Sequence, residues 1–180
     1  SIDIETGTEG KEEKILLDPN EMSEDGTISI SCLIITEDGR YLGYASSQSG
    51  SDWNTLHVKS LHDENEDMSG DTIERVKFTG TNWYKSEGFY YAKYEDEKGA
   101  EGGQGAEKES NKYQKLFYHK LHTPVEDDIV IYEDPEDPTI CIAASVTYDD
   151  RFCVLTISTT TDPVNQLHLK ETINGDLITV

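Results

Sequence analysis

The sequence predicts an all-β protein of about three four-stranded antiparallel blades, which together form an incomplete β-propeller. Three observations predict it: no segment has a helical hydrophobic period, one hairpin turn recurs three times, and the strand that follows each hairpin also recurs. Repeated units of about 40–50 residues are typical of propeller blades. Because propellers close with about 4–8 blades, three blades leave sheet faces and edges that other structure must cover.

The first repeated element is a tight turn between two strand-like runs. Its copies are residues 36–41 (TEDGRY), 85–90 (KSEGFY) and 147–152 (TYDDRF). An acidic residue followed by Gly or Asp suits the positive-φ positions of a hairpin turn. We therefore expect each turn to join the first two strands of a blade. We place these strands at residues 32–35 and 41–45, 79–83 and 89–94, and 143–146 and 152–158.

The second repeated element is the third strand of each blade. Residues 54–59 (NTLHVK), 114–119 (QKLFYH) and 165–170 (NQLHLK) align without gaps. Their alternation places the leucine and the next aliphatic or aromatic residue on one sheet face, and lysine or histidine on the other. We therefore expect the histidines of these strands on a solvated face. A fourth strand is expected at residues 72–78 in the first copy and at residues 128–132 in the second.

Two segments lack a strand pattern. Residues 1–14 form an acidic lead-in, and residues 15–180 form the propeller segment. Residues 95–111 are inserted in the middle copy, are rich in Gly, Glu and Lys and have no apolar anchor, so we expect a mobile, solvated loop. A single β-sandwich is the alternative fold, because its strands also recur every ~8–12 residues. The recurrence of both the turn and the third strand favours the propeller.

The charge of the chain restricts its partners. Its 180 residues include 15 Lys and Arg against 37 Asp and Glu, which gives a formal net charge of −22. Such a chain is repelled by phosphate backbones and anionic lipid headgroups, so we expect neither nucleic acid nor a membrane as a partner. No run approaches the ~20 apolar residues of a membrane span.

The three cysteines, Cys32, Cys141 and Cys153, lie in separate apolar stretches. An odd, widely spaced set does not predict a disulfide framework or a zinc site. We expect three buried thiols in a reducing compartment, which places the protein in the cytoplasm.

No complete set of catalytic or metal-binding residues is visible. The chain has no Gly-x-Ser-x-Gly, no Gly-rich phosphate loop and no His-Glu-x-x-His. Residues 63–74 match the oxygen spacing of a calcium loop, but Met68 stands where the sharp turn needs Gly, so we expect a solvated acidic loop. His119 and His122 have metal-ligand spacing only on a helix. We predict no metal, no cofactor and no enzyme activity for these residues alone, which form a binding or scaffolding array.

Six stretches go beyond the repeat pattern. They are residues 16–20 (LLDPN), 23–27 (SEDGT), 49–53 (SGSDW), 74–78 (ERVKF), 114–119 (QKLFYH) and 162–165 (DPVN). Their order and spacing resemble the N-terminal propeller of the prolyl oligopeptidase (prolyl endopeptidase) family, over residues 15–169. Residues 144–147 (ASVT) are similar to plant members of the family.

The resemblance implies a seven-bladed propeller that caps an α/β-hydrolase domain. Members of this family are cytosolic serine peptidases that cleave short peptides after proline, with a Ser-Asp-His triad in the hydrolase domain. This chain would supply about three consecutive blades of the cap, which excludes folded proteins, and none of the catalytic residues. The implied partners are the hydrolase domain of the same protein and a short proline-containing peptide.

The resemblance also implies four residues of a substrate pocket. Phe78 matches the aromatic wall residue of the family, and an ordinary core position in a blade is the alternative for this residue. Cys141 and Thr161 stand where the family commonly has Met and Cys, and Ser158 stands where it has Arg. These departures remove a cation and change the volume of the pocket.

Two other functions stay open. Some plant members of the family are peptide macrocyclases, in which the substrate's own amine attacks the acyl-enzyme instead of water. A non-catalytic propeller that binds a protein partner on its open face is the alternative from a different class. The repeated turns fit both classes, whereas the LLDPN and DPVN stretches favour the peptidase.

Overall fold

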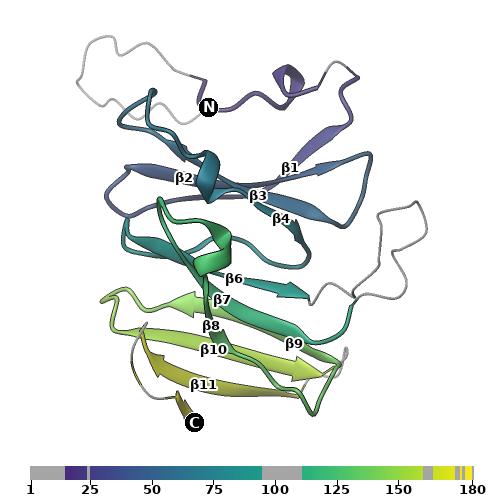
Figure 1. Ribbon diagram of the computed structural model, residues 1–180, viewed down its shortest axis with the longest axis vertical. Helices are drawn as coiled ribbons and strands as arrows, with labels where there is room; N and C mark the ends of the chain where they lie inside the picture. The colour runs from purple at the N-terminus through teal and green to yellow at the C-terminus, as the bar shows by residue number, and fades with distance from the viewer. Residues whose placement is uncertain are drawn as a thin grey trace, which may run out of the picture.

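The computed structural model describes residues 15–23, 25–94, 111–159, 164–172, 175 and 177–179. Its strands form three four-stranded antiparallel sheets, each with its strands in chain order. Figure 1 shows the sheets stacked one on another from the N-terminal to the C-terminal end of the chain. This arrangement confirms about three consecutive blades of an incomplete propeller.

The predicted strands form within a few residues of their expected bounds. The first blade contains β1 (Ile28–Ile35), β2 (Tyr41–Gln48), β3 (Asn54–Ser60) and β4 (Ile73–Val76). The second contains β5 (Asn82–Tyr84), β6 (Gly88–Tyr94), β7 (Gln114–Lys120) and β8 (Ile129–Tyr132). The third contains β9 (Ile140–Val146), β10 (Phe152–Thr159), β11 (Asn165–Glu171) and β12 (Leu177–Thr179). The described residues also form three short 3-10 turns, η1 (Pro19–Glu21), η2 (Ser69–Asp71) and η4 (Val125–Asp127).

The repeated turns form as predicted, with the same side-chain hydrogen bond in the first and third blades. The Thr36 hydroxyl donates to the Asp38 carboxylate at 2.7 Å, and the Thr147 hydroxyl donates to the Asp149 carboxylate at 2.7 Å. Asp150 has a φ of +57°, so the expected left-handed conformation is present even without glycine. Aspartate tolerates this conformation because its short polar side chain hydrogen-bonds locally.

The strand ends differ from expectation in two places. β1 begins at Ile28 rather than at residue 32, because a bulge between Ser31 and Leu33 interrupts the alternation that marks a strand. Cys32 lies in this bulge with a φ of +57°. β12 completes the third blade, and its few residues are too short to show a period of two.

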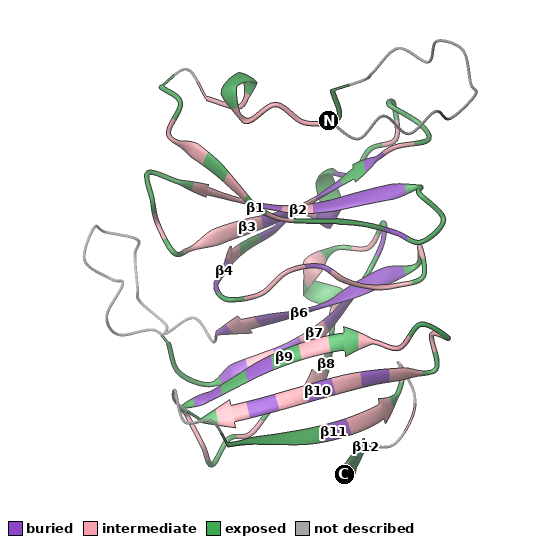
Figure 2. Ribbon diagram, turned by 180° about the vertical axis from the view of Figure 1, so that it is seen from behind, coloured by how far each residue is buried: buried purple, intermediate pink, exposed green. Residues whose placement is uncertain are grey.

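The core lies in two layers, one on each face of the second blade. β6 contributes to both layers, since Phe89 and Tyr91 pack against the first blade while Tyr90 and Ala92 pack against the third. Figure 2 shows this strand as almost entirely buried. Burying one large apolar side chain contributes roughly 1.5–3 kcal/mol, so the middle blade is stabilised from both sides.

Two of the three histidines of the third strands do not lie on a solvated face. His119 is fully buried and His168 is buried, whereas His57 pairs with Tyr44 and lies half-buried on the outer face of the first blade. The predicted alternation is present, but a blade packs against a neighbour on each face, so alternate residues point into two different interfaces. His119 and His168 point toward the preceding blade, where they meet Asp71 and the ring of Tyr132, respectively.

The outer faces of the first and third blades keep apolar side chains exposed. Leu33 and Ile35 are exposed on the first blade, and Leu167 and Ile178 are exposed on the third. The pairing of Leu33 with Tyr44 places it on the face that points away from the second blade. Such open faces are what an incomplete propeller predicts.

Two predicted segments fall outside the described ranges. They are residues 1–14, which form the acidic lead-in, and residues 95–110 of the mobile insertion, so both stay predictions. Within the described ranges, no helix has the length and the apolar character that crossing a membrane requires.

Candidate functional site

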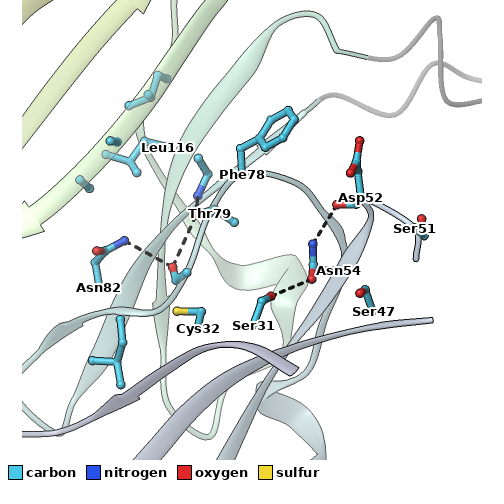
Figure 3. Close-up of a pocket in the computed structure, with 16 residues that line it drawn as sticks. Ser31, Cys32, Ser47, Ser51, Asp52, Asn54, Phe78, Thr79, Asn82 and Leu116 are labelled. Atoms are coloured by element: carbon cyan, nitrogen blue, oxygen red, sulfur yellow. Dashed lines mark hydrogen bonds between the residues drawn. The ribbon is translucent and has the colours of Figure 1, made fainter. Parts of the chain in front are cut away.

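A cavity of about 610 Å³ spans the three blades. It is lined mainly by the first strand of each blade, β1, β5 and β9, and by residues 78–80, which join the first blade to the second. Figure 3 labels side chains of the wall from the first two blades and from the segment that joins them. A concave site at the meeting point of several elements is the usual place for a small ligand or a peptide segment.

Polar side chains of the cavity wall are fixed by hydrogen bonds (Figure 3). The Ser31 hydroxyl donates to Asn54 Oδ1 at 3.1 Å, and Asn54 Nδ2 donates to the Asp52 carbonyl at 2.8 Å. The Thr79 hydroxyl accepts the backbone amide of Ala92 at 2.8 Å. Among the described residues that line the cavity, Asp52 alone carries a charge. The wall therefore offers short, mostly neutral donors and acceptors, which suit an extended peptide backbone.

Phe78 lines this cavity and follows β4 by two residues. It is 67% exposed, and its backbone has a φ of +57°. The left-handed conformation costs a bulky residue roughly 1–2 kcal/mol. The exposure excludes the alternative that Phe78 is an ordinary core residue of these blades.

The neighbour of Phe78 is a buried lysine that the sequence pattern did not single out. Lys77 Nζ lies 3.2 Å from the Asp52 carboxylate. The same nitrogen lies 5.4 Å from the centroid of the Trp53 ring and 5.1 Å from the centroid of the Phe78 ring. No local signal in the sequence marks this lysine, because its contacts are with Asp52 and Trp53 of another loop.

Cys141 and Ser158 lie side by side in the third blade. They are paired across β9 and β10, and their neighbours Ile142 and Ile157 form the core against the second blade. The period of two therefore places Cys141 and Ser158 on the outer face of the third blade. Neither is among the described residues that line the cavity. The structure thus brings two of the predicted pocket residues together and does not join them to the cavity wall.

The cysteines only partly meet the expectation of buried thiols. Cys153 is buried and Cys32 is half-buried, but Cys141 is exposed. The Cys141 sulfur lies 3.8 Å from the hydroxyl of Tyr94, a residue of β6 in the second blade. Thr161, the fourth predicted pocket residue, lies outside the described residues.

A buried polar cluster joins the first and second blades. The His119 ring lies between two carboxylates, with Nδ1 2.7 Å from Asp128 and Nε2 3.0 Å from Asp71. The Tyr91 hydroxyl donates to Asp128 at 2.7 Å, and the His122 amide donates to Asp71 at 2.7 Å. The side chains of His119, Asp71 and Asp128 are almost fully buried. We call these five residues the His119 cluster.

The two carboxylates keep His119 protonated. Burial lowers the pKa of His119, but its hydrogen bonds to Asp128 and Asp71, together with their negative charges, outweigh burial and raise the pKa to about 9. The ring therefore donates from both nitrogens at neutral pH. In the aligned third strands of the other two blades, lysines occupy this position, at Lys59 and Lys170.

The acidic segment of residues 63–74 is not wholly solvated. Asp71 belongs to this segment and is fully buried, because it accepts hydrogen bonds from His119 and His122 across the interface. The residues in the described ranges contain no group of three His, Cys, Asp or Glu side chains that could hold a metal ion.

Three stacked four-stranded sheets match the architecture of a known domain. The family domain described as "Prolyl oligopeptidase, N-terminal beta-propeller domain" matches residues 2–179. The chain belongs to the prolyl oligopeptidase family. Its three blades are a segment of the N-terminal propeller of that family.

Individual prolyl oligopeptidases and prolyl endopeptidases are similar to this segment. The prolyl endopeptidase of Elizabethkingia meningoseptica is 34% identical over 165 residues, which cover 92% of this chain and 22% of that protein. A structure from an analysis of two prolyl endopeptidases has a TM-score of 0.77 and 28% identity, and the match covers 93% of this chain and 22% of that chain.

A further solved relative has a peptide bound. Prolyl oligopeptidase B from Galerina marginata, bound to a 25mer macrocyclization substrate, has a TM-score of 0.72 and 27% identity. That match covers 88% of this chain and 23% of that chain. The chain spans about a fifth of the length of the curated relatives that it matches.

Proposed function

We propose that this chain is the substrate-gating part of the propeller in a serine peptidase of the prolyl oligopeptidase type, which cleaves short peptides after proline. The observation that carries the proposal is the match to the family propeller over residues 2–179. In this proposal the Ser-Asp-His triad belongs to an α/β-hydrolase domain of the same protein. The same match argues against a non-catalytic propeller that binds a protein partner.

The blades act on the reaction by controlling access to it. The exposed apolar side chains on the outer faces of the first and third blades suit further blades that close the ring. A closed ring over the catalytic domain admits short peptides, excludes folded chains and limits the water that reaches the acyl-enzyme.

The cavity wall contacts the substrate in this proposal. An extended peptide exchanges hydrogen bonds with the neutral polar side chains of the wall, and the Phe78 ring packs against an apolar substrate side chain. We keep Cys141, Ser158 and Thr161 as proposed pocket residues. Cys141 and Ser158 are paired across β9 and β10, and Ala143, which shares the face of Cys141 on β9, lines the cavity.

A peptide macrocyclase of the same family is the second candidate. It is favoured by the similarity to prolyl oligopeptidase B from Galerina marginata, which was solved with a macrocyclization substrate. Both reactions pass through an acyl-enzyme on the catalytic serine. Water releases a linear acid from this intermediate, whereas the amino terminus of the same peptide releases a cyclic amide.

We also propose that the protein is cytoplasmic. The three cysteines are free, and burial raises the pKa of the Cys153 thiol to about 12, which keeps it unreactive in a reducing compartment. The net charge of −22 supports the absence of nucleic acid and membrane partners. Recovery of the protein from a secreted or organelle fraction would contradict this location.

The decisive experiment uses the full-length protein and proline-containing peptides, with the products identified by mass spectrometry. Linear fragments that end in proline support the peptidase, and a product lighter than the linear fragment by one water supports the macrocyclase. Cleavage after other residues, or no turnover of any proline-containing peptide, contradicts both. The 180-residue segment alone should show no turnover, because the proposed nucleophile is not in it.

A further inference from the structure

The ammonium of Lys77 is buried where it contacts the Phe78 ring but not the cavity. Lys77 is 4% exposed and is not among the described residues that line the cavity. Its Nζ lies 3.2 Å from Asp52 Oδ2, 5.1 Å from the Phe78 ring centroid and 5.4 Å from the Trp53 ring centroid. A buried ammonium is costly unless it is paired, so these contacts fix its position.

Phe78 needs a support of this kind. A ring that is 67% exposed is not held by core packing, and its backbone has the left-handed φ of +57°. Sparsely populated backbone conformations of this sort persist only when the surroundings hold them. A cation over the ring attracts it electrostatically, and the attraction is stronger where the cation is desolvated.

The support itself is anchored in two blades. The Arg75 guanidinium also lies over the Trp53 ring, with its central carbon 5.4 Å from the ring centroid. Tyr94 of the second blade meets Trp53 edge to face, with 6.5 Å between the ring centroids. The Lys77 ammonium therefore lies between the Phe78 ring, the Trp53 ring and the Asp52 carboxylate, and it is shielded from solvent.

We propose that Lys77 is a positioning residue for substrate recognition, whose ammonium holds the Phe78 ring in the orientation that contacts an apolar substrate side chain. This inference rests on the proposed function, because it assumes that Phe78 touches the peptide. Asp52 and Trp53 hold Lys77 in place, so the cation acts through Phe78 and does not touch the substrate.

The test measures substrate preference in the full-length protein. Peptides carry Phe or Ala at each of the three positions before the cleaved proline, and the ratio of kcat/KM for Phe over Ala is determined where the wild type prefers Phe. Lys77→Met and Lys77→Gln should lower this ratio about fivefold, mainly through a higher KM for the Phe peptide. Lys77→Arg should keep most of it, since arginine retains the cation.

Two variants separate the possible causes of a lower ratio. Lys77→Gln keeps a donor for Asp52, so a loss of preference in a folded Gln variant reports the missing charge. Lys115→Met is the matched control, because Lys115 is a partly buried lysine of the second blade whose Nζ lies 2.9 Å from Glu133, and it should leave the ratio unchanged.

Each contrary outcome has one meaning. If Phe78→Ala lowers the ratio but Lys77→Met and Lys77→Gln do not, the positioning role of Lys77 is wrong and the substrate contact of Phe78 stands. If Phe78→Ala also leaves the ratio unchanged, or the wild type shows no preference for Phe, the inference fails together with that contact. If the wild type cleaves no proline-containing peptide, the proposed function itself fails.

Discussion

The second blade meets its two neighbours through different chemistry. The interface with the first blade contains the His119 cluster beside an apolar layer. The interface with the third blade is an apolar layer that includes Leu116, Ile142 and Leu155. Two side chains of the second blade add polar contacts there: Gln114 Oε1 accepts the Ile142 amide at 2.6 Å, and the Tyr94 hydroxyl lies 3.8 Å from the Cys141 sulfur.

Adjacent tyrosines of β6 show the difference most directly. The Tyr91 hydroxyl faces the first blade and donates to Asp128, whereas the Tyr90 hydroxyl faces the third blade and is buried without a hydrogen-bond partner among the described residues. Apolar contact is non-directional and tolerates small shifts. Buried charged groups are stable only when all of their partners are in place, because the loss of any partner leaves an uncompensated ion. The first interface is therefore the stricter of the two.

The largest effect should come from Asp71→Ala in the first interface. The substitution leaves the His119 cation with one carboxylate and removes the acceptor of the His122 amide, so we expect a loss of roughly 3–5 kcal/mol in local stability. Hydrogen exchange of the β4 and β7 amides in the full-length protein measures it. Asp67→Ala, at an exposed position of the same loop, is the control and should change little. Equal losses of stability in the two variants would show that the hydrogen bonds of the His119 cluster do not contribute more than an exposed residue of the loop.

In the second interface, Leu155→Ala should cost roughly 2–5 kcal/mol, because the fully buried side chain leaves a cavity. The loss should appear as faster exchange of the β9 and β10 amides while β4 stays protected. Val154→Ala is the matched control, since Val154 pairs with Leu169 on the outer face of the third blade. Faster exchange in the first blade to the same degree would mean that the two interfaces do not open separately.

Alkaline pH should weaken the first interface alone. The pKa of His119 is about 9 in the folded protein against 6.5 for an ordinary histidine. The stability from protonated His119 is therefore fully present below pH 6.5 and is lost as the pH rises through about 9. Burial raises the pKa of Tyr90 and of Tyr91, so these hydroxyls stay protonated in this window.

The measurement is the exchange protection of β7 against β10 between pH 6 and pH 10, corrected for intrinsic exchange rates. Protection of β7 should fall while protection of β10 stays constant. A parallel fall in both strands would contradict the assignment of the effect to His119.

The smallest effects should come from the two tyrosines. Tyr91→Phe removes a donor from the buried Asp128 carboxylate and should cost roughly 1–3 kcal/mol. Tyr90→Phe removes a hydroxyl without a described partner and should be neutral or slightly stabilising. Thermal unfolding of the two variants, side by side, compares them directly. A larger loss for Tyr90→Phe would reverse the comparison of the interfaces.

Local patterns in the sequence predicted the repeated elements well, because the information for a turn or a strand lies in neighbouring residues. The acidic residue and its Gly or Asp predicted each hairpin, and alternation predicted the third strands. Phe78 was found through the family resemblance, and the structure places it in the cavity wall. Cys141 and Ser158 were assigned to the same pocket; the structure pairs them across β9 and β10, and their pocket role stays a prediction.

The His119 cluster could not be predicted, because it depends on contacts between distant residues. His119 and Asp71 are 48 positions apart and belong to different blades. A period of two separates the faces of a strand, but it does not tell which face meets a neighbour and which meets water. Lys77 was missed for a related reason, since its burial depends on Asp52 and Trp53 of another loop.

Similar modules in one chain risk joining in the wrong order, because each presents nearly the same surface to its neighbours. Position 119 distinguishes them, since the matching residues of the other two copies are Lys59 and Lys170. A flexible ammonium does not reproduce the rigid ring that places one donor on Asp71 and another on Asp128. Among the three copies, only the second therefore completes the buried contact that the first one offers, so a blade paired with the wrong neighbour would leave Asp71 without its ring donor.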